Sequence, residues 1–512
     1  MMILSLLLLP LVGAVMIAVW PGLGRACAAR LAIAWAVLPV ICVSAMGLTH
    51  ARWAKGVIAE WSLPWMPEAN IHLAFSVDGT SWLFLLLTAV ITLFVLAMSD
   101  RLHIGDRAYV ALILVMESML FGVFTARHFI PWFLCWEMTL IPAYLLIRLW
   151  GGKGAPRAAL RFFIITLGGG VAMLLGFLAL QMSVGTMDFA ALGQLAANHE
   201  LAPALAKSFA ATGVDGHGLL TLVAVAVFLG LAVKIPVVPF HAWLPDAYAE
   251  APTPVTILLT GLLSKMGVFG LLRVFLPVFS EVLPGLAPWL TGLAVATVLL
   301  GAIAALAQKD LKRILAYSSV NHLGYCVLGV AGVAATQANH GAVASVVSGV
   351  VLQAFNHGVI ATALFFGVGL LEMRSGGARG LNEFGGLRAN MPVLAGLMGL
   401  SLFASLGLPG LSGFVGEFLI FSGVFALVPW SAAISLIGLL LTAVFLLRVI
   451  RKVFHGPLSP AMAKWSDLTL GERWLFAPLI ALILIPGLWP QVLLHNINGD
   501  TLRLLELLHP IP

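Results

Sequence analysis

The stretch 227–243, VFLGLAVKIPVVPFHAW, decides how this chain folds. It is apolar enough to cross a bilayer, yet it contains the charged Lys234 followed by two prolines, Pro236 and Pro239. A charge at the centre of a membrane helix costs at least ~2.5–3.5 kcal/mol, so an intramembrane lysine indicates a functional site. Prolines beside it predict a broken helix, which is tolerated only where the freed backbone groups meet protein or water. Together these features predict an ion path through a membrane.

The composition excludes a soluble protein. The chain has 512 residues, of which 61% are hydrophobic and only 9% charged, and its mean hydropathy is +1.06. An all-α polytopic membrane protein is therefore predicted. The first apolar run has no basic flank and no cleavage site, so we expect it to be the first span. The net charge of +6 reflects the loops and does not predict nucleic-acid binding.

No cofactor motif is present in the sequence. The four cysteines lie far apart, at Cys27, Cys42, Cys135 and Cys326, and form no C-x-x-C or Cys/His spacing. Haem, iron–sulfur clusters and metal sites are therefore not predicted. There is also no glycine-rich dinucleotide fingerprint, so any redox chemistry linked to this chain is expected elsewhere.

Runs of about 20 apolar residues predict fourteen membrane helices. They are expected near 2–20, 30–48, 79–99, 108–126, 129–149, 159–182, 217–247, 254–277, 285–307, 314–336, 341–371, 390–425, 429–451 and 474–494. A Trp- and Pro-rich segment at 49–78 is predicted to form an interfacial hairpin, and 186–212 a surface helix.

Two of the predicted helices, the seventh and the twelfth, are long and interrupted. The first contains Pro236 and Pro239, and the second contains Gly407, Pro409 and Gly410. They are five helices apart, and paired interrupted helices in corresponding positions are typical of transporters built from two repeats. The alternative is that proline and glycine are simply common in membrane helices.

Lys and Arg predict the orientation of the chain. They concentrate in the odd-numbered loops, near 25–30, 101–107, 148–161, 309–313, 374–388 and 448–473. The even-numbered loops contain only Arg52, Lys55, Arg127, Lys207 and Arg273. By the positive-inside rule, the odd loops are cytoplasmic and both termini lie outside.

A short set of ionisable residues remains inside the predicted spans. It consists of Glu117, Glu137, Lys234, Lys265, Glu417, His322 and His357. Glu137 stands about eight residues into its helix, or ~12 Å deep in a ~30 Å core. Lys234, Lys265 and Glu417 fall at similar depths, which predicts a row in the membrane plane. Such groups can pair or neutralise, and so take up and release protons.

Structural roles remain as alternatives for each member of this row. A carboxylate such as Glu117 can simply bond a neighbouring helix, and Glu137 can pair with a lysine without transport. His322 and His357 sit among polar residues as relays do, but a hydrogen-bonded structural histidine fits the same pattern. His241, seven residues after Lys234, is expected on the same helix face.

Two carboxylates beyond the broken helix are read differently. Asp246 and Glu250, in LPDAYAEAPTP, are expected in a loop, as solvated or capping groups rather than members of the row.

Three strings resemble the antiporter-like subunits of respiratory complex I, a family that includes Mrp-type sodium/proton antiporters and membrane-bound hydrogenases. They are KIPVVPFHAWLPDAYAEAPTPVTILLTGLLSKMG at 234–267, AQKDLKRILAYSSVNHLGY at 307–325 and LPGLSGFVGEF at 408–418. Within the family, the M-type subunits of bacterial NADH–quinone oxidoreductase fit best. The chain has fourteen predicted helices without a lateral arm, begins MMILSLLLLPLVGA, and has Glu417 where other members usually have lysine.

The resemblance implies a role for each residue. Glu137 and Lys234 would form a pair, Lys265 would be the central protonable lysine, His322 a relay, and Glu417 the terminal residue. Glu117, His241, His357, Pro236, Pro239 and Pro409 would support the path. One departure is RFFIITLGGG at 161–170, where Arg161 stands in place of a usual lysine.

The resemblance also implies how the chain is divided. The N-terminal helices and external hairpin loop would occupy 1–107. Two inverted five-helix repeats would follow at 108–277 and 278–455, and a last helix at 456–512.

The predicted function is a non-redox, proton-translocating subunit of a bacterial inner-membrane NADH–quinone oxidoreductase. The resemblance implies L- and N-type membrane neighbours, with NADH, FMN, iron–sulfur clusters and quinone bound by partner subunits. One alternative is a stand-alone or Mrp-like cation/proton antiporter. Another is a structural spacer, which the buried charges argue against, since a spacer would be more stable without them.

Overall fold

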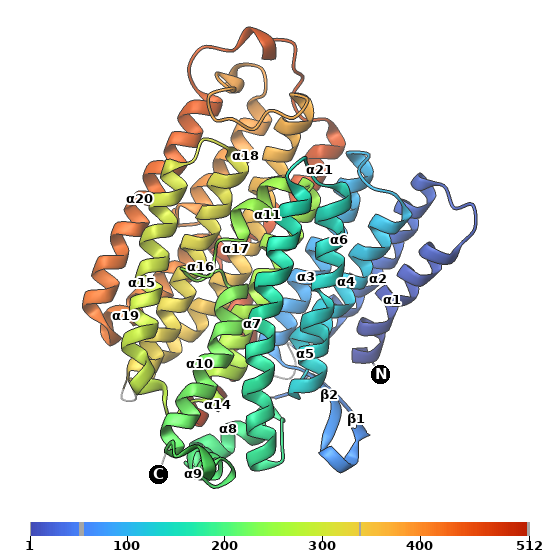
Figure 1. The fold of residues 1–512 in the computed structure, drawn as a ribbon. Coiled ribbons are helices and arrows are strands. Elements are labelled where there is room, and N and C mark those ends of the chain that lie inside the picture. Colours follow the sequence, from blue (N-terminus) through green and yellow to red (C-terminus); the bar gives the residue numbers. More distant parts are fainter. Residues whose placement is uncertain (1, 51–55, 337–338, 509–512) are drawn as a thin grey trace.

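The computed structural model describes residues 2–50, 56–336 and 339–508, and it shows a bundle of helices that run side by side (Figure 1). In the described part of the chain, thirteen helical segments are long and apolar enough to cross a membrane. They are α1 (Met2–Val19), α2 (Arg25–His50), α3 (Gly79–Arg101), α4 (Arg107–Thr125), α5 with α6 (Phe129–Met138 and Leu140–Trp150), α7 (Ala155–Val184), α10 (Gly216–Lys234), the continuous segment Thr253–Val278, α15 (Leu283–Ala307), α16 (Leu311–Ala335), α17 (His340–Arg374), α20 (Pro429–Phe454) and α21 (Leu470–Leu488).

The predicted all-helical membrane fold is confirmed, including both helix breaks. Helix α10 ends at Lys234, and a short helix, α11 (Leu244–Glu250), follows a run of turns. The predicted twelfth helix consists of two shorter helices, α18 (Pro392–Ser405) and α19 (Ser412–Leu427). The left-handed backbone at Gly407 and Gly410 ends one helix and redirects the chain into the next.

Backbone groups freed at the first break find partners within the protein. The amide of Val238 donates to Thr297 Oγ1 at 3.0 Å, and the indole of Trp243 donates to the carbonyl of Val233 at 3.0 Å. At the second break, the Asn356 amide donates to the Ser412 carbonyl at 2.7 Å. These contacts make the interruptions compatible with the membrane interior.

The core of the bundle is formed by the segment Thr253–Val278, α16 and α17. The most apolar windows of Thr253–Val278 and α17 are wholly buried, whereas at most a third of the residues in the corresponding windows of α1, α2, α20 and α21 are buried. Apolar exposed residues cover these outer helices, as expected for surfaces that face lipid. Lys265, His322 and His357 of the predicted row lie on these central helices, whereas the other four members, Glu117, Glu137, Lys234 and Glu417, lie on α4, α5, α10 and α19.

Several elements lie at the end of the molecule that carries both termini (Figure 1). Antiparallel strands β1 (Ala59–Met66) and β2 (Ile71–Val77) form the predicted hairpin; Arg52 and Lys55 fall outside the described residues. The predicted surface helix at 186–212 is confirmed as two pieces, α8 (Phe189–Ala197) and α9 (Leu201–Ser208). A C-terminal helix, α22 (Gln491–Leu508), was not predicted.

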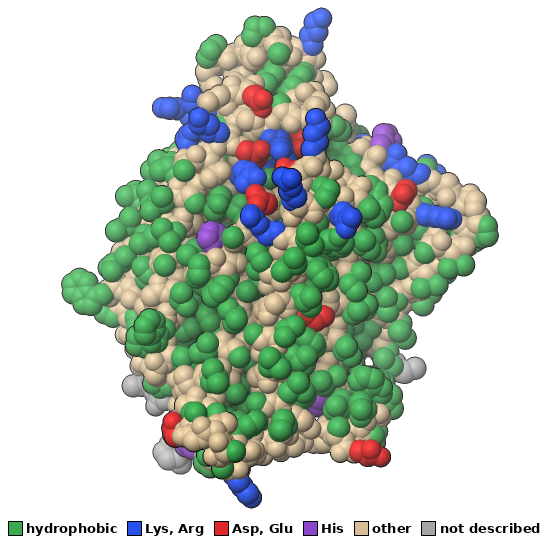
Figure 2. All heavy atoms as spheres, viewed as in Figure 1, with side chains coloured by type: hydrophobic (Ala, Val, Ile, Leu, Met, Phe, Trp, Pro, Cys, Tyr) green, Lys and Arg blue, Asp and Glu red, His purple; other side chains and the backbone are tan. Residues whose placement is uncertain are grey.

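Basic side chains are concentrated at one end of the bundle. Figure 2 shows Lys and Arg side chains gathered at the end opposite the termini, over the ends of α6, α11 and α18. This distribution follows the loop asymmetry in the sequence. By the positive-inside rule the charged end is cytoplasmic, which stays a prediction here.

Close contact between α17 and α19 can be tested at Gly349. A Cβ at this position would lie 2.7 Å from the Ile420 nitrogen and 2.9 Å from Leu419 Cβ. Because overpacking costs ~1–3 kcal/mol, Gly349→Val should lower the thermal denaturation midpoint of the purified protein. The matched control is Gly292→Val in α15, where an added Cβ meets nothing within 4 Å. Equal midpoints for the two variants would contradict this packing.

Candidate functional site

Lys234 ends α10 in a pocket made by aromatic side chains. It is 2% exposed, and its ammonium lies 5.4 Å from the ring centre of Trp136 and 5.9 Å from that of Phe162. Such contacts contribute ~0.5–2 kcal/mol to holding the charge. Neither Lys234 Nζ nor the carboxylate of Glu137 has a hydrogen-bond partner among the described residues. No hydrogen bond therefore joins the two predicted partners in this structure.

The glycines of α7 make room for Glu137. A Cβ at Gly170 would overlap Glu137 Oε1, so the RFFIITLGGG string allows the carboxylate to face α7. Its first residue, Arg161, has a different task, because it pairs with Asp246 at 2.7 Å. The string therefore contacts two different carboxylates: Gly170 lies against Glu137, and Arg161 pairs with Asp246.

Lys265 lies in the most deeply buried helical segment. The backbone there alternates between π- and α-helical turns: α12 (Thr253–Leu258), a π-turn at Leu259–Leu263, α13 (Ser264–Gly270), a second π-turn at Leu271–Phe275, and α14 (Leu276–Val278). Such π-turns are rare in proteins overall, and those that occur are often found at functional sites. The Lys265 ammonium, 0% exposed, donates to the Thr260 carbonyl and lies 3.3 Å from Ser264 Oγ.

A continuous series of contacts joins Lys265 to Glu417. Lys265 Nζ lies 2.7 Å from His357 Nδ1, and the ring centres of His357 and His322 are 5.6 Å apart. His322 Nδ1 is 3.2 Å from Glu417 Oε1, close enough for an ion pair but without hydrogen-bond alignment. His322 Nε2 is 3.2 Å from Ser405 Oγ. Four ionisable groups from α13, α17, α16 and α19 therefore form one buried row.

A ladder of hydroxyl groups leads from Lys265 toward the charged end of the bundle. Thr253, Thr256, Thr260 and Ser264 recur every three or four residues, which places them on one helix face. Thr260 Oγ1 lies 3.1 Å from Ser319 Oγ, and Thr253 donates to Glu372 at 2.9 Å. A cavity of about 10 Å³, the size of one water, lies between Ser318, Ser319, His357 and Ser405.

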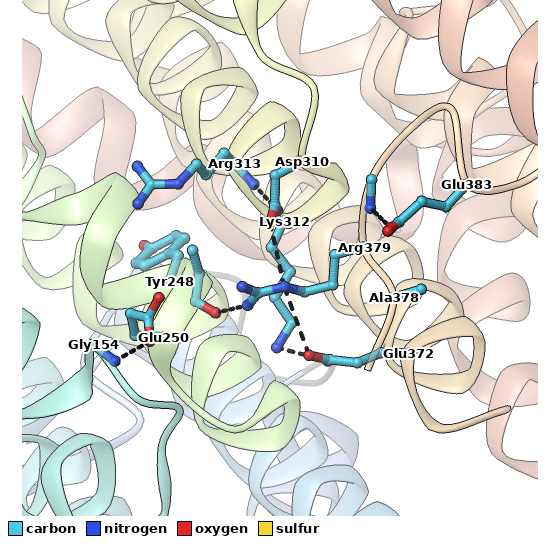
Figure 3. A network of polar contacts seen from close by, with 12 residues as sticks. Gly154, Tyr248, Glu250, Asp310, Lys312, Arg313, Glu372, Ala378, Arg379 and Glu383 are labelled. Carbon is cyan, nitrogen blue, oxygen red and sulfur yellow. Dashed lines mark hydrogen bonds and ion pairs between the residues drawn. The ribbon is translucent and has the colours of Figure 1, made fainter. Parts of the chain in front are cut away.

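The ladder ends at an ionic network, shown in Figure 3. Lys312, 1% exposed, pairs with Glu372 at 2.8 Å and donates to the Ala251 carbonyl at 3.2 Å. Arg379 lies 3.2 Å from Asp310 and 3.9 Å from Glu372. Lys312 falls within the basic stretch 309–313, which was predicted to be a loop. Its spacing of seven residues from Ser319, two helical turns along α16, was the signal that could have shown it facing inward.

Some predicted residues lie away from the row. His241 is not on the helix face of Lys234, because α10 ends at Lys234 and the prolines turn the chain; its ring stands against Tyr317 at 6.2 Å. Glu117 is wholly buried in α4, with no hydrogen-bond partner among the described residues.

The two carboxylates beyond the broken helix are bonded to other parts of the bundle. Asp246 pairs with Arg161 and, at 2.9 Å, with Arg313. Glu250 accepts a hydrogen bond from the Gly154 amide at 2.9 Å. Of the two, Asp246 does more than the capping expected from the sequence, since it joins α7 to α16.

A second ionic cluster lies at the opposite end of the bundle. Asp78, which caps α3 by accepting from the Ser81 amide at 2.9 Å, pairs with Arg273 at 2.6 Å. Asp500 of α22 accepts from the Thr80 amide at 2.6 Å. Burial and the nearby Asp78 carboxylate raise the pKa of Asp500 to about 6. The cluster attaches the C-terminal helix to the core.

Within the described residues, no group of three or more His, Cys, Asp or Glu side chains is placed to hold a metal ion. Fold and site together define a multi-pass membrane protein with a buried row of titratable groups between two broken helices. Residues 126–443 match the family model described as NADH:quinone oxidoreductase/Mrp antiporter, TM. The chain belongs to this family, and it is a homologue of its M-type membrane subunits.

Individual relatives resemble most of the chain. The NADH-quinone oxidoreductase subunit M of Rhodobacter capsulatus is 36% identical over 441 residues, covering 86% of this chain and 83% of that protein. The F(420)H(2) dehydrogenase subunit M of Methanosarcina mazei is 35% identical, covering 87% and 86%. A chain of respiratory complex I from Thermus thermophilus superposes with a TM-score of 0.83 and 30% identity, covering 99% of this chain and 100% of that one.

The raised pKa of Asp500 predicts a pH-dependent attachment of α22. Between about pH 3.8, the ordinary value, and about 6, the folded state binds more protons than the unfolded state, so stability falls as pH rises through this window. Amide hydrogen-exchange protection at Thr80 and along α22, corrected for intrinsic rates, should therefore be higher at pH 5 than at pH 7. Asp500→Asn should remove this difference, whereas Asp215→Asn, at the exposed start of α10, should keep it. A difference that survives in Asp500→Asn would exclude this carboxyl as its source.

Proposed function

We propose that this chain is a proton-translocating membrane subunit of a redox-driven NADH–quinone oxidoreductase. The observation that carries the proposal is the buried series Lys265–His357–His322–Glu417, with contacts of 2.7 Å and 3.2 Å at its two ends. Each group can hold or release a proton, and a histidine ring can accept at one nitrogen while donating from the other.

Protons reach Lys265 along the hydroxyl ladder. The Lys312–Glu372 pair stands at the charged end and Thr253 links Glu372 to the ladder. Hydroxyl groups suit this task because each donates one proton and accepts another. The contact between Thr260 and Ser319 supports the route, since it extends the ladder to a second helix next to His357.

The Glu137–Lys234 site controls the central lysine. When Glu137 separates from Lys234, the buried ammonium loses its counter-charge, so its positive charge acts more strongly on the protonated Lys265. No hydrogen bond joins Lys234 to Lys265 among the described residues. Repulsion between two buried ammonium groups then favours transfer from Lys265 to His357 and on to Glu417. Moving one charge against 100 mV costs ~2.3 kcal/mol, so the cycle needs an external driving reaction.

The driving reaction belongs to partner subunits, which would bind NADH, FMN, iron–sulfur clusters and quinone, while L- and N-type subunits flank this chain in a bacterial inner membrane. The similarity to a subunit of an F(420)H(2) dehydrogenase leaves a second electron donor open. Co-purification of the native complex, with NADH and F(420)H(2) tested as donors, decides between them. An Mrp-like antiporter is the alternative function; it would purify without redox subunits.

Lys234→Ala tests the control site. Because it removes the charge that Glu137 modulates, the variant should abolish redox-linked proton pumping in proteoliposomes while the complex still assembles. Lys207→Ala, at an exposed position of α9, should pump like the wild type. Pumping ratios equal to wild type in an assembled Lys234→Ala complex would refute this assignment.

Thr260→Val tests the hydroxyl ladder. The change keeps the side-chain volume but removes the contact with Ser319, a hydrogen bond worth ~1 kcal/mol. A barrier raised by this amount slows proton transfer roughly fivefold, measured as pumping rate at saturating donor. The control is Thr221→Val in α10, whose hydroxyl bonds only the carbonyl of His217 in its own helix. Identical rates in both variants would exclude Thr260 from the route.

A further inference from the structure

A surface groove runs between α18 and α20 from the charged end of the bundle to the second helix break. It encloses about 740 Å³. Arg388 and His455 line its charged end, Gly396 and Gly399 line its middle, and Leu408 and Pro409 line its far end. A Cβ added at Gly396 or Gly399 meets nothing within 4 Å. The groove is therefore open space along α18, a short apolar helix.

The groove is as deep as one leaflet of a membrane. Pro392, Gly396, Gly399 and Phe403 recur at intervals of three and four residues and so form one stripe along α18. From Pro392 to Phe403 the helix rises ~16 Å, about half of the ~30 Å hydrocarbon core. A partner's membrane helix would need a groove twice as long, whereas one lipid acyl chain fits this length.

The charges at the rim favour an anionic headgroup. Arg388 and His455 are exposed, and neither side chain forms an ion pair among the described residues. Arg451 and Lys452 in the last turn of α20 add two further cations nearby. No acidic residue lines the groove. Basic side chains at the membrane surface attract anionic lipids, and arginine binds phosphate with two parallel hydrogen bonds.

We propose that the α18–α20 groove binds one anionic phospholipid, with its phosphate at Arg388 and His455 and an acyl chain along Gly396 and Gly399. The end of the chain lies against Leu408 and Pro409, where it covers the helix break from the membrane side. This site is separate from the buried proton row, so it stands or falls independently of the proposed function.

Gly399→Leu is the direct test, because its side chain would occupy the groove and its Cβ meets nothing within 4 Å. The intact complex is exchanged into nanodiscs made of equal parts phosphatidylcholine and phosphatidylglycerol and then washed in detergent. Lipid retained per complex is measured by mass spectrometry. The wild type should retain one phosphatidylglycerol more than Gly399→Leu. Gly168→Leu, the same change at an exposed glycine of α7 with open space around it, should match the wild type.

Arg388→Gln separates headgroup binding from chain binding. This surface variant should keep a lipid in the groove but lose the preference for phosphatidylglycerol over phosphatidylcholine. Equal lipid retention by wild type and Gly399→Leu would overturn the proposal. So would an unchanged preference in Arg388→Gln, or density for a neighbouring subunit in the groove of the intact complex.

Discussion

The fold depends on one constraint: a backbone group that a helix break frees inside the bilayer must find its partner within the protein. Each helix break meets it with a side chain from a distant part of the sequence. Thr297 accepts from the Val238 amide at the first break, and Asn356 donates to the Ser412 carbonyl at the second. These bonds satisfy both breaks with protein groups, and Leu408 and Pro409 at the second break are nevertheless exposed at the surface of the bundle. Lys234 ends α10 at the first break, and Glu417 lies in α19 just after the second.

Glu417, at one end of the row, and the Glu137–Lys234 site differ in the groups that surround their charges. Glu417 lies 3.2 Å from His322, so its carboxylate has a neighbour that can exchange a proton. Glu137 and Lys234 have no hydrogen-bond partner in the described part of the chain, and the faces of Trp136 and Phe162 stabilise the Lys234 ammonium. An aromatic ring stabilises an ammonium but cannot take its proton. Lys234 is therefore suited to changing the local electrostatic potential, and the proton-carrying contacts begin at Lys265.

The sequence predicts spans and breaks well because hydrophobic length and proline position act locally. It identified the residues of the row but not their order of contact. His357 was expected only to support the path, yet it lies between Lys265 and His322, since the crossing of α17 over α13 and α16 is set by tertiary packing. Lys312 was missed because its position next to a helix start resembles a solvated loop charge. Its burial depends on Glu372, sixty residues away in the chain. The π-turns beside Lys265 have no sequence signal in this chain.

The ionic network at the charged end gives the two halves of the chain a shared anchor. Asp246, just after the first break, pairs with Arg161 from α7 and with Arg313 from α16. Glu372 joins Lys312 to Thr253. A displacement of α11 would therefore disturb both the arginine pair of Asp246 and, through Ala249 and Ala251, the contacts of Arg379 and Lys312. Packed interfaces change between discrete arrangements. This network can therefore couple movement at the Lys234 break to the Thr253 end of the hydroxyl ladder.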